Sequence, residues 1–97
     1  MKILLVEPRP ARAQGVADLV RAAGAGEVEA VGDATSALAR LATGDFGALA
    51  TARWLPAMGG ASLAALARTL QKGLETVVYE DPEQERGILE DLARRCR

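Results

Sequence analysis

The sequence contains no histidine among its 97 residues. Catalytic triads built on histidine, histidine-ligated metal sites and histidine proton shuttles are therefore excluded within this chain. Its one cysteine, Cys96, can form neither an internal disulfide nor a cysteine-rich zinc site, and a single thiol fits a reducing compartment. The only aromatic residues are Phe46, Trp54 and Tyr79, too few for the stacking platforms that bind single-stranded nucleic acid.

Charge and hydrophobic runs are limited as well. The 12 basic and 13 acidic residues give a net charge of −1, so no basic field draws nucleic acid or an anionic membrane. The apolar run near the N-terminus ends at Glu7 and Pro8, far too early for a signal peptide or a membrane span. We therefore expect a cytoplasmic protein that binds neither nucleic acid nor membrane, folded as a single domain over residues 1–97.

Short apolar runs alternate with segments of helical periodicity along the whole chain. The first run is apolar on both faces, as in the middle of a parallel sheet. Asp81, Pro82 and Gln84 together form the pattern of a helix start. The sequence thus predicts strands at residues 2–6, 27–31, 46–51 and 76–79, and helices at residues 11–23, 33–42, 62–71 and from 81 onwards. Four such units predict an α/β fold, a doubly wound parallel sheet with helices on both faces.

Three segments carry a resemblance to a known family. They are the run Ile-Leu-Leu-Val-Glu-Pro at residues 3–8, the strand at 46–51, and the loop Trp-Leu-Pro-Ala-Met-Gly-Gly at 54–60. With this spacing the chain resembles the receiver domain of bacterial two-component response regulators. The resemblance implies a flavodoxin-like sheet in the order 2-1-3-4, a first strand that ends in acidic residues and a third that ends in a phospho-accepting aspartate.

The chain departs from that family at the chemical positions. The phospho-acceptor position is Ala52, whose methyl group offers no nucleophilic oxygen. The acidic pair that holds magnesium in receivers is reduced to Glu7, followed by Pro8, and the switch hydroxyl falls at Glu80 or Asp81. We therefore predict a degenerate, shortened pseudo-receiver that is not phosphorylated, holds no metal or cofactor and is not an enzyme.

The strand at residues 76–79 is either the family's fourth strand, with the fifth βα unit lost, or the fifth strand after a deletion. Its distance from Pro56 favours the fourth. An open strand edge then exposes backbone groups, and we expect Val77 and Tyr79 to form a surface for self-pairing or for a partner.

The loop after the third strand supplies the other candidates for partner binding. Arg53 either neutralises Glu7 or Glu80 or is simply solvated. Trp54 either anchors a partner or folds over the former acidic pocket, and Leu55 and Met58 lie in the same loop.

The predicted function follows from these residues. We expect a phosphorylation-independent adaptor that acts by protein–protein contact in bacterial signal transduction, with a signalling kinase or regulator as a candidate partner. The alternative is a homodimerisation or assembly domain that uses the sheet edge left open by the missing fifth unit.

Overall fold

The computed structural model describes all 97 residues. Strands and helices alternate strictly along the chain, which confirms the alternation predicted from the hydrophobic pattern. The strands are β1 (Lys2–Val6), β2 (Glu27–Val31), β3 (Ala48–Ala52) and β4 (Glu75–Tyr79), and the helices are α1 (Pro10–Ala22), α2 (Ala34–Thr43), α3 (Gly60–Leu70) and α4 (Arg86–Arg95).

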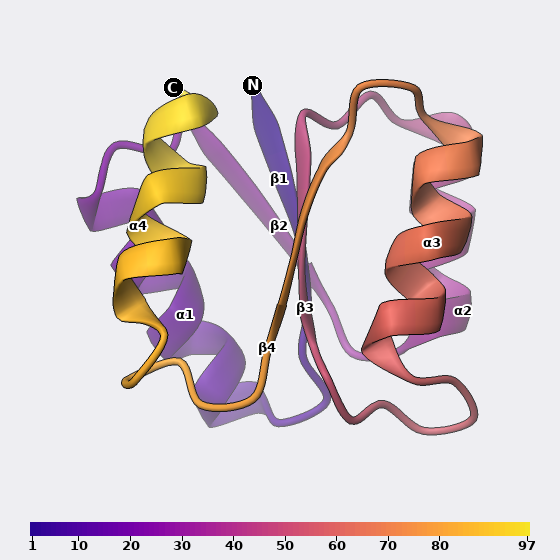
Figure 1. Ribbon diagram of the computed structural model, residues 1–97, viewed down its shortest axis with the longest axis horizontal. Coiled ribbons are helices and arrows are strands. Elements are labelled where there is room, and N and C mark those ends of the chain that lie inside the picture. Colours follow the sequence, from indigo (N-terminus) through magenta and orange to yellow (C-terminus); the bar gives the residue numbers. More distant parts are fainter.

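The four strands form one parallel sheet in the order β2-β1-β3-β4. Helices α1 and α4 cover one face, and α2 and α3 cover the other (Figure 1). The predicted doubly wound α/β fold and its strand order are therefore confirmed. β4 pairs with β3 at one edge of the sheet, an arrangement that both readings of this strand, the family's fourth or its fifth after a deletion, share.

The core consists of two layers, one on each face of the sheet, because successive side chains of a strand point to opposite faces. Ile3 and Leu5 of β1 face α1 and α4, whereas Leu4 and Val6 face α2 and α3, and all four are completely buried. A central parallel strand has to be apolar on both faces for this reason. None of the four helices combines the length and apolar character needed to cross a bilayer.

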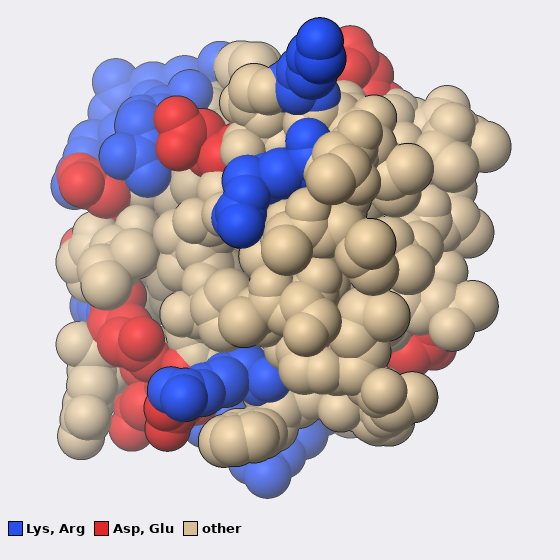
Figure 2. All heavy atoms as spheres, turned by 45° about the vertical axis from the view of Figure 1, so that its right-hand side comes forward, with Lys and Arg blue, Asp and Glu red and all other residues tan.

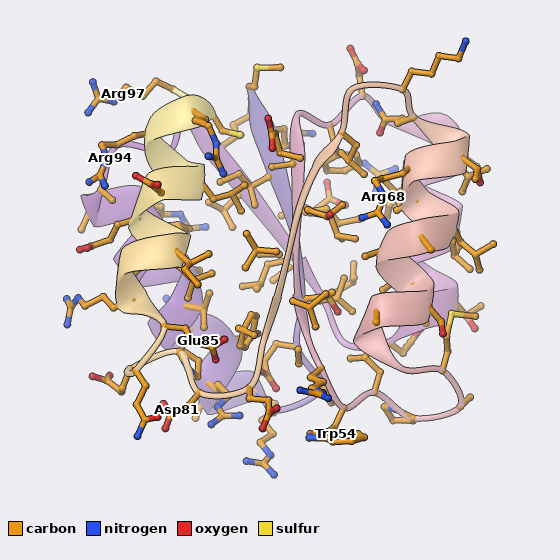
Figure 3. All side chains as sticks on the ribbon, viewed as in Figure 1. Trp54, Arg68, Asp81, Glu85, Arg94 and Arg97 are labelled. Atoms are coloured by element: carbon orange, nitrogen blue, oxygen red, sulfur yellow. The ribbon has the colours of Figure 1, made fainter.

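The last helix begins later than the sequence predicts, at Arg86 rather than Asp81. Asp81 Oδ1 accepts hydrogen bonds from the backbone N–H groups of Glu83 and Gln84, and so forms a separate turn. The Glu85 carboxylate turns back to the N–H group of Asp81 at 2.8 Å (Figure 3). The capping pattern is therefore real, but Glu85 closes it in place of Gln84, and α4 starts after this turn.

Candidate functional site at the carboxyl end of the sheet

Three side chains meet where β1, β3 and β4 end. Glu7 follows β1 directly, Ala52 is the last residue of β3, and Tyr79 is the last residue of β4. Ala52 and Tyr79 are in register across the β3–β4 ladder, so their side chains lie next to each other on the same face of the sheet. In open α/β sheets this edge is where ligands bind, which makes it the first place to look for a site.

Glu7 and Tyr79 are joined by a buried hydrogen bond. The Tyr79 hydroxyl donates to Glu7 Oε1 at 2.8 Å, and the backbone N–H of Arg9 donates to Oε2 at 3.0 Å. Tyr79 is 0% exposed and Glu7 only 3%. Both carboxylate oxygens of Glu7 are thus occupied by groups of the protein itself.

Ala52 explains why the tyrosine fits. β3 lies between β1 and β4, so the bond from Tyr79 to Glu7 has to span the end of the strand that carries Ala52. A methyl group leaves room for the phenol ring, and a larger side chain at this position would occupy the same volume. The hollow that remains, bordered by Pro8, Arg53 and Trp54 among others, measures about 60 Å³. Pockets for drug-sized small molecules start at about 300 Å³, so this hollow is too small for such a ligand.

Charged and aromatic side chains form a rim around this hollow. Arg53 Nη1 lies 2.5 Å from Glu80 Oε1, and the Arg53 guanidinium lies 5.4 Å from the centre of the Trp54 ring. Trp54 is 73% exposed at the end of the sheet (Figure 3). Of the alternatives for Arg53, the structure therefore shows pairing with Glu80 and not with Glu7. The Trp54 side chain stands at the rim, open to solvent.

Solved structures with a similar architecture include receiver domains. A CheY-like response regulator receiver domain from Methanospirillum hungatei JF-1 superposes with a TM-score of 0.72 at 24% identity, covering 95% of this chain and 74% of that one. The receiver domain of the hybrid histidine kinase CckA gives 0.71 at 22% identity and covers both chains completely. The chain has the receiver fold.

A third receiver-fold neighbour extends the comparison. The two-component transcriptional regulator AraC from Clostridium phytofermentans ISDg gives a TM-score of 0.79 at 15% identity, covering 99% of this chain and 91% of that one. By contrast, the sequence matches no protein-family model and no curated protein. The likeness to receivers therefore rests on the fold and on the motifs quoted above.

Two residues of the predicted partner surface on β4 are buried instead. Val77 is 9% exposed and Tyr79 is fully buried, and both side chains point into the core layer under α1 and α4. The expectation of an exposed Val–Tyr surface was wrong because an edge strand opens only its backbone side, while helices still cover both of its faces. Leu55 and Met58 are half-buried and pack against the core, so they too contribute little free surface.

Register also places Tyr79, rather than Glu80 or Asp81, directly beside Ala52. Glu80 is exposed at the rim and paired with Arg53, and Asp81 holds its own turn. Tyr79 was predicted only as part of a partner surface, and its place beside Ala52 was not foreseen. The sequence signal for this contact was a small residue, Ala52, at the end of one strand and the only tyrosine at the end of the neighbouring strand.

The loop between β3 and α3 is held to the site by a close backbone approach. The N–H of Gly60 donates to the carbonyl of Arg53 at 2.8 Å. A Cβ at position 60 would lie 2.2 Å from the carbonyl oxygen of Ala52, so only glycine fits. The glycine of the receiver-like loop is therefore explained by packing against the end of β3.

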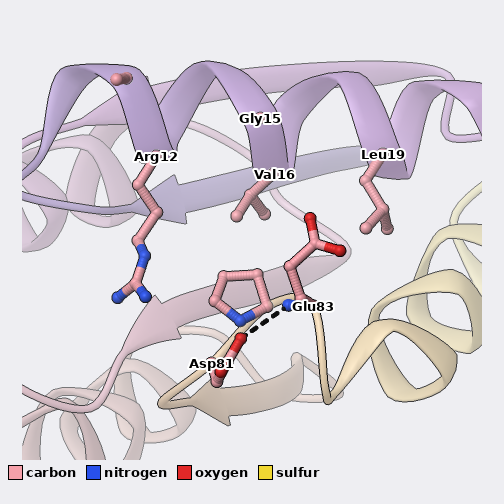
Figure 4. A pocket seen from close by; sticks show the side chains of 8 residues that line it. Arg12, Gly15, Val16, Leu19, Asp81 and Glu83 are labelled. Atoms are coloured by element: carbon pink, nitrogen blue, oxygen red, sulfur yellow. Dashed lines mark hydrogen bonds between the residues drawn. The ribbon is translucent and has the colours of Figure 1, made fainter.

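A larger, open hollow lies between α1 and the turn after β4 (Figure 4). It measures about 370 Å³ and is lined by Val16 and Leu19 together with Arg12 and Glu83. Gly15 also lines it, and a Cβ at that position would meet nothing within 4 Å. Nearby, the side chain of Arg12 donates to the Glu80 carbonyl at 3.2 Å and ties α1 to this end of the sheet.

Burial, reinforced by the hydrogen bond to Glu7, raises the pKa of Tyr79 far above the ordinary value of 10.0. A group whose pKa is higher in the folded state contributes stability below its unfolded pKa and loses it as pH rises. We therefore expect alkaline unfolding above about pH 10 in which phenolate formation and loss of helical signal coincide. Tyr79 is the only tyrosine, so the ultraviolet absorbance change on phenol ionisation reports it alone.

Tyr79→Phe is the control for this titration, because it removes the ionising group while keeping the ring. Its alkaline transition is expected at higher pH than that of the unmodified protein. A phenolate signal that appears near pH 10 while the circular dichroism stays native would contradict a buried, hydrogen-bonded hydroxyl.

Proposed function

We propose that this protein is a receiver-fold module of two-component signalling that acts through protein–protein contact and without an aspartyl phosphate. The observation that carries the proposal is Ala52 at the end of β3, beneath the hydrogen bond between Tyr79 and Glu7. Acyl phosphate formation needs a carboxylate nucleophile, and a methyl group cannot replace one.

The donor set at this edge does not fit the magnesium ion that the family implies. Mg²⁺ prefers octahedral oxygen coordination, with carboxylates, phosphate and water as ligands. Here Glu7 is the only carboxylate at the end of β1, Pro8 follows it, and both Glu7 oxygens already accept hydrogen bonds. No step through a metal is therefore part of the proposed function.

The exposed rim supports a role in protein contact. Arg53, Trp54 and Glu80 form a surface in which a largely exposed indole lies beside Arg53, which is itself paired with Glu80. Tryptophan and arginine are enriched at the energetically important centres of interfaces. Among the structural neighbours are a receiver domain of a hybrid histidine kinase and a two-component transcriptional regulator. We propose a kinase or regulator of such a system as the partner.

Intact-mass spectrometry after incubation with a small acyl phosphate and Mg²⁺ tests the proposal. We expect no mass increase, whereas a receiver that carries the acceptor aspartate gains one phosphoryl group in the same tube. A phosphoryl adduct on this chain would refute phosphorylation independence.

A further inference from the structure

The outer edge of the sheet at β4 carries backbone groups that no strand pairs. Glu75 donates its N–H to Gly47, and Tyr79 accepts from the N–H of Arg53, so the odd-numbered residues of β4 bond to the β3 side. In a parallel ladder alternate residues face opposite neighbours. The N–H and C=O groups of Thr76 and Val78 therefore point away from the sheet.

The position of α4 shows that a regular crossover through this helix cannot cover that edge. The step from β3 through α3 to β4 is right-handed with α3 on the α2 face. A strand added beyond β4 would continue in the same direction, so its right-handed crossover helix would have to lie on the α3 face. Instead α4 packs on the opposite face beside α1 (Figure 1). It is a covering helix, whatever follows it in the chain.

The free stretch of the edge has a defined end. Glu80, the next outward-facing residue, donates its N–H to the Glu85 carboxylate at 2.7 Å and accepts from Arg12 with its carbonyl. Within β4 only Thr76 and Val78 are left with unpaired groups. These two residues are two positions apart. In an antiparallel pair, residues two positions apart on one strand both hydrogen-bond to the same neighbouring strand.

We propose that a second copy of this chain pairs with β4 in antiparallel fashion, with Thr76 opposite Val78 of the second copy. The two-fold axis then passes through Val77, and all four free groups on each strand take part in four inter-chain hydrogen bonds. An isologous contact of this kind is self-complementary and closes after two subunits. The result is one continuous eight-stranded sheet.

The helix flanks that border this edge suit such a contact. Ile88 is 52% exposed on α4. α4 runs antiparallel to β4. Successive residues of a helix are about 100° apart, so Ile88, one residue before the buried Leu89, lies on the flank of α4 that is beside β4 and away from α1. Arg97, half a turn away from Ile88, lies against Gly24 at the end of α1, in agreement with this placement. Ile88 and its symmetry mate are therefore available to be buried in the dimer.

On the other face, α3 presents a flank with few charges to the same side. Arg68 of α3 donates to the Thr76 hydroxyl at 2.7 Å and so marks the flank next to β4. Alanine at positions 61 and 65 lies on that flank, and Figure 2 shows mainly uncharged atoms across this side of the molecule. Leu70 is also half exposed, at 50%, but it lies about 200° around α3 from Arg68, on the side away from the edge.

Light scattering after size exclusion, over a wide concentration range, tests the dimer with a matched pair of variants. We expect a dimer for the unmodified protein and for Leu70→Glu. Ile88 is about as exposed as Leu70 but lies at the edge. Ile88→Glu, and Val78→Pro, which removes an outward N–H, are each expected to weaken the dimer at least about tenfold. A monomer at every concentration, or equal effects of Ile88→Glu and Leu70→Glu, would overturn the proposal.

Cross-linking tests the register without relying on a weakened fold. In a Cys96→Ala background, Val77→Cys places two thiols across the axis in a non-hydrogen-bonded pair, where the Cα atoms lie about 4.5 Å apart. We expect mild oxidation to give a covalent dimer for Val77→Cys and little for Thr76→Cys. The reverse ranking would overturn the register. The result is independent of phosphorylation, so it and the proposed function can fail separately.

Discussion

Gly60→Ala is expected to lower the free energy of unfolding by about 2–4 kcal/mol. The added Cβ would lie 2.2 Å from the carbonyl oxygen of Ala52 and 3.1 Å from its carbonyl carbon. Both are backbone atoms of the strand end, so no flexible side chain can move aside. The chain can relieve the overlap only by breaking the hydrogen bond from Gly60 to Arg53 and shifting the whole loop.

Gly59→Ala is the matched control, one residue earlier in the same loop. Its φ of −68° is open to any residue, and a Cβ there would meet its nearest atom at an ordinary 3.9 Å. Urea denaturation of both variants is the measurement, and we expect Gly59→Ala to change stability by less than about 1 kcal/mol. Similar losses for the two variants would mean that the close approach at Gly60 does not exist in solution.

Ala52→Asp places a carboxyl group at the phospho-acceptor position. We expect it to lower the free energy of unfolding by about 2–4 kcal/mol at neutral pH. Ala52 is only 6% exposed, and the new carboxylate would lie under the Tyr79 ring and close to the Glu7 carboxylate. Desolvation and the like charge both raise the pKa of the new group. Since that pKa is higher in the folded state than in the unfolded state, the loss is smaller at about pH 5 than at about pH 8.

Ala52→Asn is the control for charge, since it has the same size and does not titrate. We expect it to destabilise the protein less than Ala52→Asp does at neutral pH, by an amount that does not change with pH. Thermal or urea unfolding at the two pH values separates the variants. If Ala52→Asp is as stable as the unmodified protein at neutral pH, the space beside Ala52 is open and the packing described for Tyr79 is incorrect.

Much of the fold follows from local sequence. The β1 and β2 bounds agree with the prediction because Glu7 and Pro8 end the first run, and Gly26 and Gly32 enclose the second. The strand order could be stated only through the resemblance to receivers, since periodicity alone does not order strands. The start of the last helix was predicted too early because both Gln84 and Glu85 are close enough in sequence to cap the N–H group of Asp81. The geometry of the turn at Asp81 selects Glu85.

The site was harder to predict because it depends on register between distant strands. The sequence placed Ala52 and Glu7 correctly at the ends of β3 and β1. It could not show that the Tyr79 hydroxyl reaches across β3 to Glu7, because that contact joins residues 72 positions apart. The β4 strand was therefore interpreted as a side-chain surface, whereas the side chains of Val77 and Tyr79 belong to the core.

Intact-mass measurement with an acyl phosphate donor and Mg²⁺ tests the central claim most directly, which is that this receiver fold works without a phosphoryl group. We expect an unchanged mass for the unmodified protein at donor concentrations that fully modify an aspartate-bearing receiver. A stoichiometric phosphoryl adduct, located by fragmentation at any residue bordering the space around Glu7, Ala52 and Tyr79, would contradict it.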